Sequence, residues 1–342
     1  MTIHNPCGLK GFGFLEFSSP VIKLLHEQFL RMGFTKTYTH QTQPIDLYQQ
    51  HKISFIVNGS PDSQAHTHAQ MHGSGSCAMG FEVENVDKAY AFVLNHGAKA
   101  HEEKSTINLP AIQAIGGSVI YFTDANHQPY ATQWHKFNES NPPAGLSFID
   151  HVTHNVYRGN MDKWADFYKE LFNFQQIRYF DIVGQKTGLI SRAMASPDGN
   201  IKIPLNESKD DVSQIEEFLK DYQGEGIQHI ALHTSDIYLT VERLRAQEVH
   251  FLDVPEVYYE MIQGRLPWHQ ELVSDLKRLR ILIDGEKTPK DGLLLQIFTE
   301  NTFGPVFFEI IQRKGNQGFG EGNFKALFEA IERDQMKRGT LQ

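Results

Sequence analysis

The sequence FIDHVTHNV at residues 148–156 is rich in β-branched and apolar residues and predicts a strand that is buried in the protein. An amphipathic pattern over residues 161–171 predicts a helix directly after it. Three further strand patterns follow, at residues 174–183, 187–193 and 201–205. We take this order, one strand, one helix and several strands, as the structural unit of the chain.

The same order recurs about four times along the sequence. A first copy begins with a predicted strand at residues 11–17 and a helix at 20–32, and a second begins with a strand at 79–84 and a helix at 86–95 that ends near Gly97. Other strands are predicted at 53–57, 119–123, 130–134, 227–234, 293–299 and 306–312, and other helices at 237–247, 272–280 and 323–333. The repetition predicts an α+β fold in which paired modules form curved, open sheet barrels around a cavity.

The polar segment HKFNESNPPAGL at residues 135–146 contains the Pro and Gly residues that are typical of a domain linker. A chain of 342 residues is long enough for about two domains. We therefore expect an N-terminal domain over residues 1–140 and a C-terminal domain over residues 147–342.

The charge composition, 32 basic against 41 acidic residues and a net charge of −9, disfavours binding to nucleic acid or anionic lipid. No apolar run approaches the roughly 18 residues needed to span a bilayer, and residues 1–10 do not resemble an export signal. The two cysteines, Cys7 and Cys77, are too few for a disulfide framework. These features predict a cytoplasmic protein with neither a nucleic-acid nor a membrane partner.

Three predicted strands of the C-terminal half each carry one side chain of a metal-binding type among apolar neighbours; these residues are His151, His229 and Glu309. Side chains alternate across a strand, so we expect each to share a face with the residues two positions away, which are Ile149 and Thr153, Ile227 and Ala231, and Phe307 and Ile311. A buried glutamate is rarely tolerated unless it is paired or bound to a cation. A metal ion is the simplest reason for this arrangement.

Two imidazoles and one carboxylate form the ligand set that suits non-haem Fe(II) and leaves about three coordination positions open. Zinc can use the same three ligands. The pattern alone leaves open a simpler alternative, in which all three are ordinary polar residues with satisfied hydrogen bonds. His154 is a rival for His151, but it shares its predicted face with Phe148, Val152 and Val156, which is the face expected to pack on helices.

The N-terminal half shows no equivalent ligand in its second unit. His229 lies seven residues before Asp236, and the same offset before Asp87 falls on Gly80. We therefore expect the liganding position to be filled only in the C-terminal domain.

Two other motifs have simpler explanations. In AHTHAQMH at residues 65–72, His68 and His72 are one helical turn apart and His66 is close by, but the glutamate of zinc-protease helices is missing. We interpret this segment as a short polar helix or loop that ends at Gly73. The glycine-rich GFGEGNF at residues 318–324 lacks the spacing of a phosphate loop and is interpreted as the hinge of a lid.

Six motifs resemble, in the same order, those of the 4-hydroxyphenylpyruvate dioxygenase family, which has the vicinal oxygen chelate (glyoxalase-like) fold. They are IDHVTHNV (149–156), KIPLNES (202–208), GEGIQHIAL (224–232), LLLQIFTE (293–300), PVFFEIIQRKG (305–315) and GFGEGNFKALF (318–328). The N-terminal half resembles the family mainly in the order of its modules. The resemblance implies that His151, His229 and Glu309 bind one Fe(II) per subunit.

The resemblance also implies a set of substrate-binding residues, namely Ser191, Asn206, Gln214, Gln296, Phe298, Phe307, Phe319, Asn323 and Phe324. Gln296 is expected to fix a keto acid, and Phe298, on the same strand face, to border an aromatic ring. Phe319, Asn323 and Phe324 match the helix that closes over the cavity in the family. For each phenylalanine, plain core packing is the alternative, and Asn206 can either touch the substrate or support the site.

For function, the resemblance implies conversion of 4-hydroxyphenylpyruvate and dioxygen into homogentisate and carbon dioxide. This is a step of tyrosine and phenylalanine breakdown, and its product can autoxidise to a brown pigment. Family members are commonly homodimers or homotetramers. Two alternatives remain: hydroxymandelate synthase, which shares the fold, iron and substrate, and a non-catalytic metal- or small-molecule-binding protein of the same fold.

Overall fold

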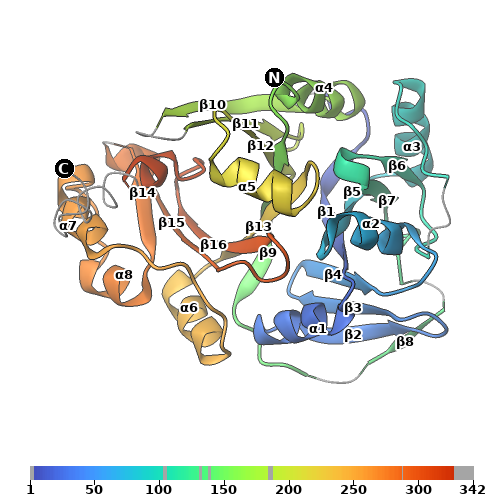
Figure 1. Ribbon diagram of the computed structural model, residues 1–342, viewed down its shortest axis with the longest axis horizontal. Helices are drawn as coiled ribbons and strands as arrows, with labels where there is room; N and C mark the ends of the chain where they lie inside the picture. The colour runs from blue at the N-terminus through green and yellow to red at the C-terminus, as the bar shows by residue number, and fades with distance from the viewer. Residues whose placement is uncertain are drawn as a thin grey trace.

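The computed structural model describes residues 4–102, 106–130, 133–137, 140–183, 188–286 and 288–326. Within these ranges the chain forms two mixed sheets of eight strands each, with helices around them (Figure 1). The predicted α+β architecture of paired modules with curved sheets is confirmed.

The first sheet has the strand order β6-β7-β5-β1-β4-β3-β2-β8. Its strands are β1 (Leu9–Ser18), β2 (Thr35–His40), β3 (Ile45–Gln50), β4 (Ile53–Asn58), β5 (Gly75–Val83), β6 (Ala111–Gln113), β7 (Val119–Thr123) and β8 (Trp134–Lys136). The helices between them are α1 (Ile22–Arg31), α2 (Gln64–His72), α3 (Val86–Asn95) and the 3₁₀ turn η1 (Ile115–Gly117).

The second sheet has the strand order β10-β11-β12-β9-β13-β16-β15-β14. Its strands are β9 (Leu146–Val156), β10 (Gln175–Val183), β11 (Gly188–Ala195), β12 (Lys202–Ser208), β13 (Gly226–Thr234), β14 (Leu282–Gly285), β15 (Leu293–Phe298) and β16 (Phe307–Lys314). Its helices are α4 (Met161–Phe172), α5 (Gln214–Asp221), α6 (Ile237–Ala246), α7 (Glu256–Arg265), α8 (Val273–Leu279) and the 3₁₀ turn η2 (Pro289–Asp291).

The two sheets repeat one topology. In the first, β1 pairs in parallel with β4 and antiparallel with β5, and β5 pairs in parallel with β7. In the second, β9 pairs in the same ways with β12 and β13, and β13 pairs in parallel with β16. The sheets therefore correspond strand by strand, with β8 and β14 as additional edge strands.

Most predicted elements are present, and α3 and β7 have the predicted bounds. The sequence reasoning missed β2, β3, β6, α5, α7 and β14. Of the strand expected at 130–134, only β8 from Trp134 is seen, and residues 131–132 lie outside the described part of the chain. Residues 321–326 are helical, and the rest of the helix expected at 323–333 lies outside the described residues.

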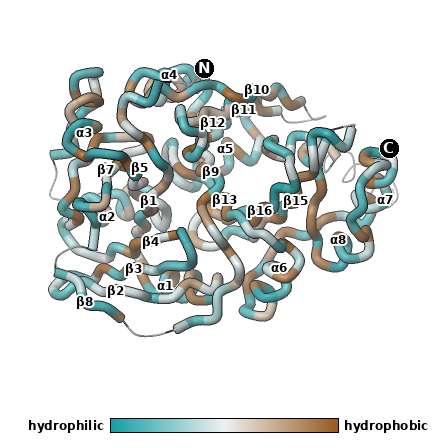
Figure 2. Tube along the Cα trace, turned by 180° about the vertical axis from the view of Figure 1, so that it is seen from behind, coloured by the Kyte–Doolittle hydropathy of each residue, from teal (hydrophilic) through white to brown (hydrophobic). Residues whose placement is uncertain are grey.

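One apolar core joins the two halves of the molecule. The amphipathic helix α1 buries Leu25 and Phe29, and Phe29 packs against Phe17 with ring centroids 5.0 Å apart. Phe303, from the turn between β15 and β16, reaches across to Phe17 at 5.7 Å. Hydrophobic stretches lie along the interior strands, whereas polar residues dominate the peripheral helices and turns (Figure 2).

The AHTHAQMH segment forms the polar helix α2, which ends at Gly73 as interpreted, and it contacts the second half of the chain. The two ring nitrogens of His72 lie 2.8 Å from the carbonyl oxygens of Tyr222 and Gly116. The His72 ring also stacks on Tyr222 at 4.5 Å, and His68 Nε2 lies 3.2 Å from the Tyr222 hydroxyl. This cluster joins the two sheets.

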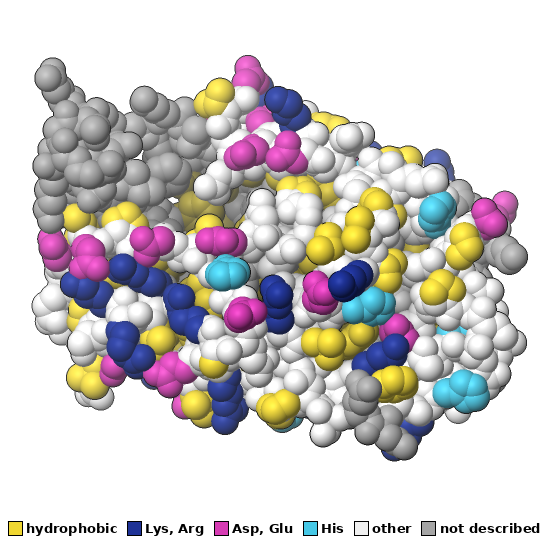
Figure 3. Space-filling model, turned by 60° about the horizontal axis from the view of Figure 1, so that its bottom comes forward, with side chains coloured by type: hydrophobic (Ala, Val, Ile, Leu, Met, Phe, Trp, Pro, Cys, Tyr) yellow, Lys and Arg dark blue, Asp and Glu magenta, His cyan; other side chains and the backbone are white. Residues whose placement is uncertain are grey.

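The surface carries both charge signs in close proximity. On the face in Figure 3, basic side chains lie beside acidic ones. Ion pairs of the surface include Arg278–Glu242 at 2.8 Å and Arg280–Asp253 at 2.9 Å. Among the helices of the described ranges, none combines the length and apolar composition needed to cross a bilayer.

A β-bulge precedes His151 at the centre of the second sheet. In the register of β9 and β13, Ala231 lies opposite His151 and Leu232 lies opposite Ile149, so Asp150 is the extra residue. A bulge changes which face the following side chains point to. Ile149 therefore lies on the opposite face from His151, and the expected sharing of one face is wrong for this pair.

A second bulge precedes His229. His229 lies opposite Thr153, and Ile227 lies opposite His154, so Gln228 is the extra residue. Ile227 consequently points to the opposite face from His229. The expectation that Ile227 and His229 share one face is therefore wrong. Thr153 is two residues after His151 on β9 and points to the same face of the sheet, and His229, its partner on β13, points there too. We call this the concave face.

The first sheet has the same two bulges, at Gly13 and Cys77 between β1 and β5. Counting from these bulges, Phe14 occupies the position of His151, and Ala78 occupies that of His229. The position equivalent to His229 is therefore Ala78.

The expected equivalence of Gly80 with His229 is therefore wrong. The offset was counted from Asp87, but the residue that caps α3 is Asn85, whereas Asp236 caps α6. Ala78, at the corrected position, has no side-chain atom that can bind a metal.

Candidate metal centre

Three adjacent strands bring the predicted ligand side chains together. His151 comes from β9, His229 from β13 and Glu309 from β16. Glu309 Oε2 lies 3.2 Å from His151 Nε2 and 3.7 Å from His229 Nε2. One ligand atom from each of the three side chains lies within 4.8 Å of the others, and this is the only such group of three or more found in the described ranges.

The residues that form the bulges hold the two imidazoles. Asp150 Oδ1 lies 2.9 Å from His151 Nδ1, and Gln228 Oε1 lies 3.0 Å from His229 Nδ1. Each acceptor fixes the tautomer in which Nδ1 carries the proton and Nε2 presents its lone pair. Both Nε2 atoms lie near Glu309, so the rings are oriented as metal ligands require.

The charges around the cluster favour a cation. Burial opposes protonation of His151, but the carboxylates of Glu309 and Asp150 outweigh it and raise the pKa of His151. Burial, and then the neighbouring His151, lower the pKa of His229 well below its usual value. His151 is 2% and Glu309 is 2% exposed. A buried carboxylate facing two imidazoles is the environment that a divalent metal ion stabilises.

The donor set fits a metal with nitrogen and oxygen preference. Two Nε2 atoms and one carboxylate are the ligands of non-haem iron sites, and zinc accepts the same set. Three protein ligands would leave about three coordination positions of such a metal for a chelating substrate. The side chains present therefore satisfy what such a metal requires.

Hydrogen bonds connect Glu309 to Asn323, which lies in the helical residues 321–326. Gln296 Nε2 donates to Glu309 Oε1 at 3.2 Å, and Asn323 Nδ2 donates to Gln296 Oε1 at 3.0 Å. The Tyr258 hydroxyl donates to Asn323 Oδ1 at 2.6 Å. Gln296 and Asn323, two of the predicted substrate residues, are thus hydrogen-bonded in series to Glu309.

Aromatic rings border the cluster on two sides. Phe307 stacks on the His229 ring at 4.9 Å, and Phe298 lies 6.1 Å from Phe307. On the other side, the Phe319 ring is 5.3 Å from the His151 ring. Three of the four predicted phenylalanines therefore form an apolar wall, whereas Phe324 is 37% exposed.

Ser191 and Asn206 lie further along the concave face. They are register partners on β11 and β12, and Asn206 is the partner of Asn155 on β9. Asn155 points to the same face as His151, because β9 itself has no extra residue between these two positions. Gln214, by contrast, is the exposed first residue of α5, and no described contact joins it to the cluster.

Sequence reasoning missed Asp150, Gln228, Arg313 and Asn155. Asp150 and Gln228 immediately precede the two histidines. In a bulge, the side chain of the extra residue can point to the same face as that of its neighbour. Arg313 lies four residues after Glu309 and pairs with Asp150 at 2.7 Å. Asn155 is buried, and neither polar atom of its side chain has a hydrogen-bond partner in the described structure.

His154 is not part of the cluster. Its Nε2 lies 2.7 Å from the Tyr168 hydroxyl on the helix side of the sheet, and burial lowers its pKa to about 3. The preference for His151 over His154 therefore agrees with the geometry.

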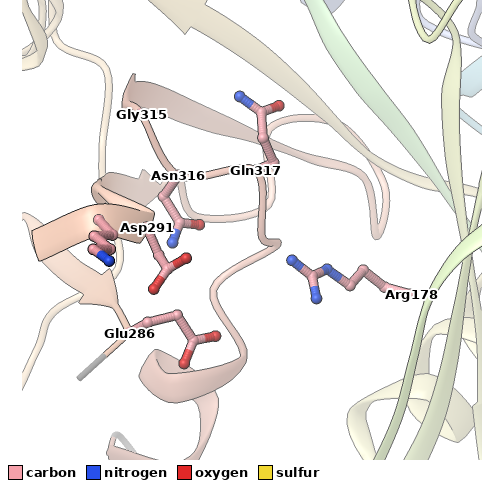
Figure 4. Close-up of a pocket in the computed structure, with 7 residues that line it drawn as sticks. Arg178, Glu286, Asp291, Gly315, Asn316 and Gln317 are labelled. Atoms are coloured by element: carbon pink, nitrogen blue, oxygen red, sulfur yellow. The ribbon is translucent and has the colours of Figure 1, made fainter. Parts of the chain in front are cut away.

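A separate polar cleft lies beyond the end of β16 (Figure 4). It has a volume of about 370 Å³ and is lined by Arg178, Glu286, Lys290, Asp291, Gly315, Asn316 and Gln317. Arg178 projects from β10 toward the acidic side chains on the opposite wall. None of its lining residues belongs to the metal cluster.

Comparisons with known proteins give the same picture of the fold. Residues 3–134 match the family described as "Hydroxyphenylpyruvate dioxygenase, HPPD, N-terminal", and residues 148–263 match the "Glyoxalase/Bleomycin resistance protein/Dioxygenase superfamily". A solved variant of 4-hydroxymandelate synthase from Streptomyces coelicolor has a TM-score of 0.81 at 23% identity, covering 96% of this chain and 99% of that one. At this identity the likeness shows the fold.

Full-length relatives are much closer in sequence. A 4-hydroxyphenylpyruvate dioxygenase of Legionella pneumophila (strain Corby) is 63% identical over 100% of this chain and 99% of its own length. One from Pseudomonas aeruginosa is 50% identical over 99% of this chain and 98% of its own length. The chain therefore belongs to the 4-hydroxyphenylpyruvate dioxygenase family.

Proposed function

We propose that this chain converts 4-hydroxyphenylpyruvate and dioxygen into homogentisate and carbon dioxide, using one Fe(II) per subunit. The observation that carries the proposal is the convergence of His151, His229 and Glu309 in a buried, aromatic-walled site of a chain 63% identical to a 4-hydroxyphenylpyruvate dioxygenase. The donor set supports iron among the metals that accept it.

His151, His229 and Glu309 would hold the metal, and three protein ligands would leave coordination positions for the keto acid. Ferrous iron, when bound, supplies the redox chemistry between dioxygen and a chelating α-keto acid. Asp150 and Gln228 keep the two imidazoles in the orientation that binding needs.

The other residues of the site position the substrate. Gln296 and Asn323 offer amide groups to the keto-acid end, and Phe298, Phe307 and Phe319 enclose the ring. Apolar walls exclude water, which protects reactive species from side reactions. Ser191 and Asn206, further along the same face, are suited to hydrogen-bond the phenol hydroxyl.

The reaction balances without a second organic substrate. One oxygen atom of dioxygen enters the carboxylate that forms as carbon dioxide leaves, and the other becomes the new ring hydroxyl. The keto acid itself supplies the electrons. This chemistry places the chain in tyrosine and phenylalanine breakdown, and the product can feed pigment formation by autoxidation.

Product identification tests the proposal. The purified protein is incubated with Fe(II), ascorbate, air and 4-hydroxyphenylpyruvate, and the aromatic product is identified by chromatography and mass spectrometry. Homogentisate supports the proposal. 4-Hydroxymandelate identifies the benzylic reaction instead, and unchanged keto acid with stoichiometric metal identifies a binding protein.

We also propose a cytoplasmic location, a homodimeric or homotetrameric assembly, and domain limits at residues 1–140 and 147–342. The absence of a bilayer-crossing helix from the described residues is compatible with the location. Light scattering on the purified chain measures the assembly, and cell fractionation measures the location.

A further inference from the structure

The guanidinium of Arg313 donates hydrogen bonds both to Asp150, the partner of His151, and to backbone carbonyls just after β16. Arg313 lies on β16 and is 8% exposed at its side chain, while that of Asp150 is 1% exposed. Its Nε and Nη2 donate to the two carboxylate oxygens of Asp150 at 2.8 and 2.7 Å. Paired bonds of this kind fix direction as well as distance.

The third nitrogen of the guanidinium, Nη1, binds residues that follow β16 instead of Asp150. Arg313 Nη1 donates to the carbonyl oxygens of Gly318 at 2.7 Å and Asn316 at 3.2 Å. The Arg313 guanidinium also lies 5.7 Å from the centre of the Phe319 ring, which itself borders His151. We define residues 316–319 as the closing segment.

These contacts form one continuous connection. The Asp150 oxygen that accepts from Arg313 Nη2 also lies 2.9 Å from His151 Nδ1. A shift of the closing segment moves the carbonyl acceptors of Nη1, and a rigid planar guanidinium transmits that shift to Asp150. Asp150 in turn fixes the His151 ring.

We propose that Arg313 is a positioning residue that sets the orientation of His151 according to the position of the closing segment. The proposal rests on the proposed function for the role of His151 as a metal ligand. It adds that the metal centre responds to the segment that covers the substrate, through one side chain.

The chemistry of arginine makes the proposal specific. Lysine keeps the positive charge but is a compact donor that cannot reproduce the bidentate pair with Asp150 and simultaneously reach two carbonyls. Partners of metal-bound histidines typically change metal affinity or activity about 10- to 100-fold when altered. Arg313→Lys separates charge from geometry, and Asp150→Asn interrupts the same connection at its next link.

The control is an arginine of the same sheet on the opposite face. Arg192 on β11 pairs with Asp162 of α4 at 2.8 Å and is 23% exposed at its side chain. Arg192→Lys makes the same chemical change outside the metal cluster. It is expected to leave metal binding and its spectrum unchanged.

Cobalt(II) serves as the probe, because its visible absorption bands report the geometry of its ligands without turnover. Arg313→Lys and Asp150→Asn are each expected to shift these bands and to weaken Co(II) binding about 10- to 100-fold, measured by chelator competition. The double variant is expected to lose no more than the stronger single variant, because both changes break one connection. Wild-type bands and affinity in Arg313→Lys overturn the proposal.

A change in the closing segment tests the direction of coupling. A Cβ on Gly318 would lie 2.8 Å from Glu321 Oε2 and 2.9 Å from Asn316 Oδ1, and both atoms accept backbone N–H bonds within the segment. Gly318→Ala is therefore expected to displace the segment and change the Co(II) bands. The same substitution in the Arg313→Lys background is expected to have no further effect; an undiminished effect there overturns the proposal.

The experiments distinguish an error in the proposed function from an error in the proposed role of Arg313. If the wild-type chain binds cobalt but forms no homogentisate with Fe(II), the proposed function fails, and the Co(II) comparison still tests Arg313. Circular dichroism and thermal melting accompany each variant. Should Arg313→Lys prove unfolded, the Asp150→Asn and Gly318→Ala spectra decide the question, since unchanged bands in both contradict the coupling.

Discussion

The two sheets have the same strand order and the same two bulges, but one has a buried metal-ligand set and the other does not. His151, His229 and Glu309 correspond to Phe14, Ala78 and Tyr121, because Glu309 pairs with Ala231 as Tyr121 pairs with Gly80. The bulge residues Asp150 and Gln228 correspond to Gly13 and Cys77. The backbone geometry of the site therefore does not depend on the ligand side chains.

Apolar packing replaces ligand chemistry in the first sheet. The rings of Phe14 and Tyr121 lie 5.8 Å apart, and Ala78 belongs to the same buried cluster. A Cβ on Gly80 would lie 2.3 Å from the Phe14 ring, so the glycine makes room for it. In the second sheet the corresponding residue is Ala231, since an imidazole needs less space than the phenylalanine ring.

Glu16 is a buried carboxylate on the concave face of the first sheet. Glu16 corresponds to Thr153 and is buried, and Asn58 Nδ2 donates to its Oε1 at 2.6 Å. Its Oε2 has no hydrogen-bond partner within the described part of the chain. Burial raises the pKa of Glu16 to about 7. Glu16 thus has a neutral amide as its hydrogen-bond partner, whereas Glu309 lies beside two imidazoles.

The largest effect is expected from removing the metal carboxylate. Glu309→Ala leaves two imidazoles without an anionic ligand, so we expect loss of bound iron and at least a roughly 1,000-fold fall in oxygen uptake with the keto acid. Iron is measured by elemental analysis and oxygen with an electrode. Glu16→Ala, at the carboxylate of the first sheet, should keep its iron. A Glu309→Ala protein with full iron and normal uptake contradicts the assignment.

Next in size is the pH dependence of stability caused by Glu16. Because its folded-state pKa is raised from 4.5 to about 7, the folded chain holds a proton that the unfolded chain releases. Stability is therefore highest below about pH 4.5 for this group and is lost as pH rises to 7, by up to about 3 kcal/mol.

Glu16→Gln should remove this loss, because a neutral amide keeps the acceptor for Asn58. Urea unfolding at pH 5 and pH 8 measures the difference, with Glu82→Gln, an exposed carboxylate of β5, as control. Equal pH dependence in wild type and Glu16→Gln is the outcome that contradicts the prediction.

The packing difference predicts unequal results for matched substitutions. Gly80→Ala should destabilise the chain by about 1–3 kcal/mol, because the new methyl group overlaps the Phe14 ring. Ala231→Gly, at the equivalent position, removes a methyl group and should cost about 1 kcal/mol. Denaturant unfolding measures both. If Phe14→Leu does not relieve the cost of Gly80→Ala, the overlap is not its cause.

The smallest effect concerns the second bulge. Gln228→Ala frees Nδ1 of His229, and we expect metal affinity to fall about 10-fold, at the lower end of the range for such partners. Cys77→Ala makes the matched change in the first sheet and should leave metal affinity unchanged. Chelator competition measures both. A similar fall in both variants indicates a general loss of packing instead.

The sequence predicted that His151, His229 and Glu309 come together, because each is a side chain of a metal-binding type among apolar strand residues. It did not predict the bulges at Asp150 and Gln228, because a register slip depends on the partner strand. For that reason the faces of Ile149 and Ile227 were predicted wrongly, although the ligand positions were not. The strand β2 was missed because its residues are mostly polar, and β3 was missed because Asp46, Gln49 and Gln50 make half of it polar although most of it is buried. The exposure of Gln214 depends on how α5 packs, which local pattern does not determine.

The apolar core that runs between the sheets makes the halves inseparable. Phe303 packs on Phe17, and a Cβ on Gly116 would lie 1.9 Å from the carbonyl oxygen of Glu225. A gene cut between the halves would leave each fragment with an uncovered hydrophobic flank prone to aggregate. The first repeat is therefore needed to cover the core of the second, although Phe14, Ala78 and Tyr121 stand where His151, His229 and Glu309 lie in the other sheet.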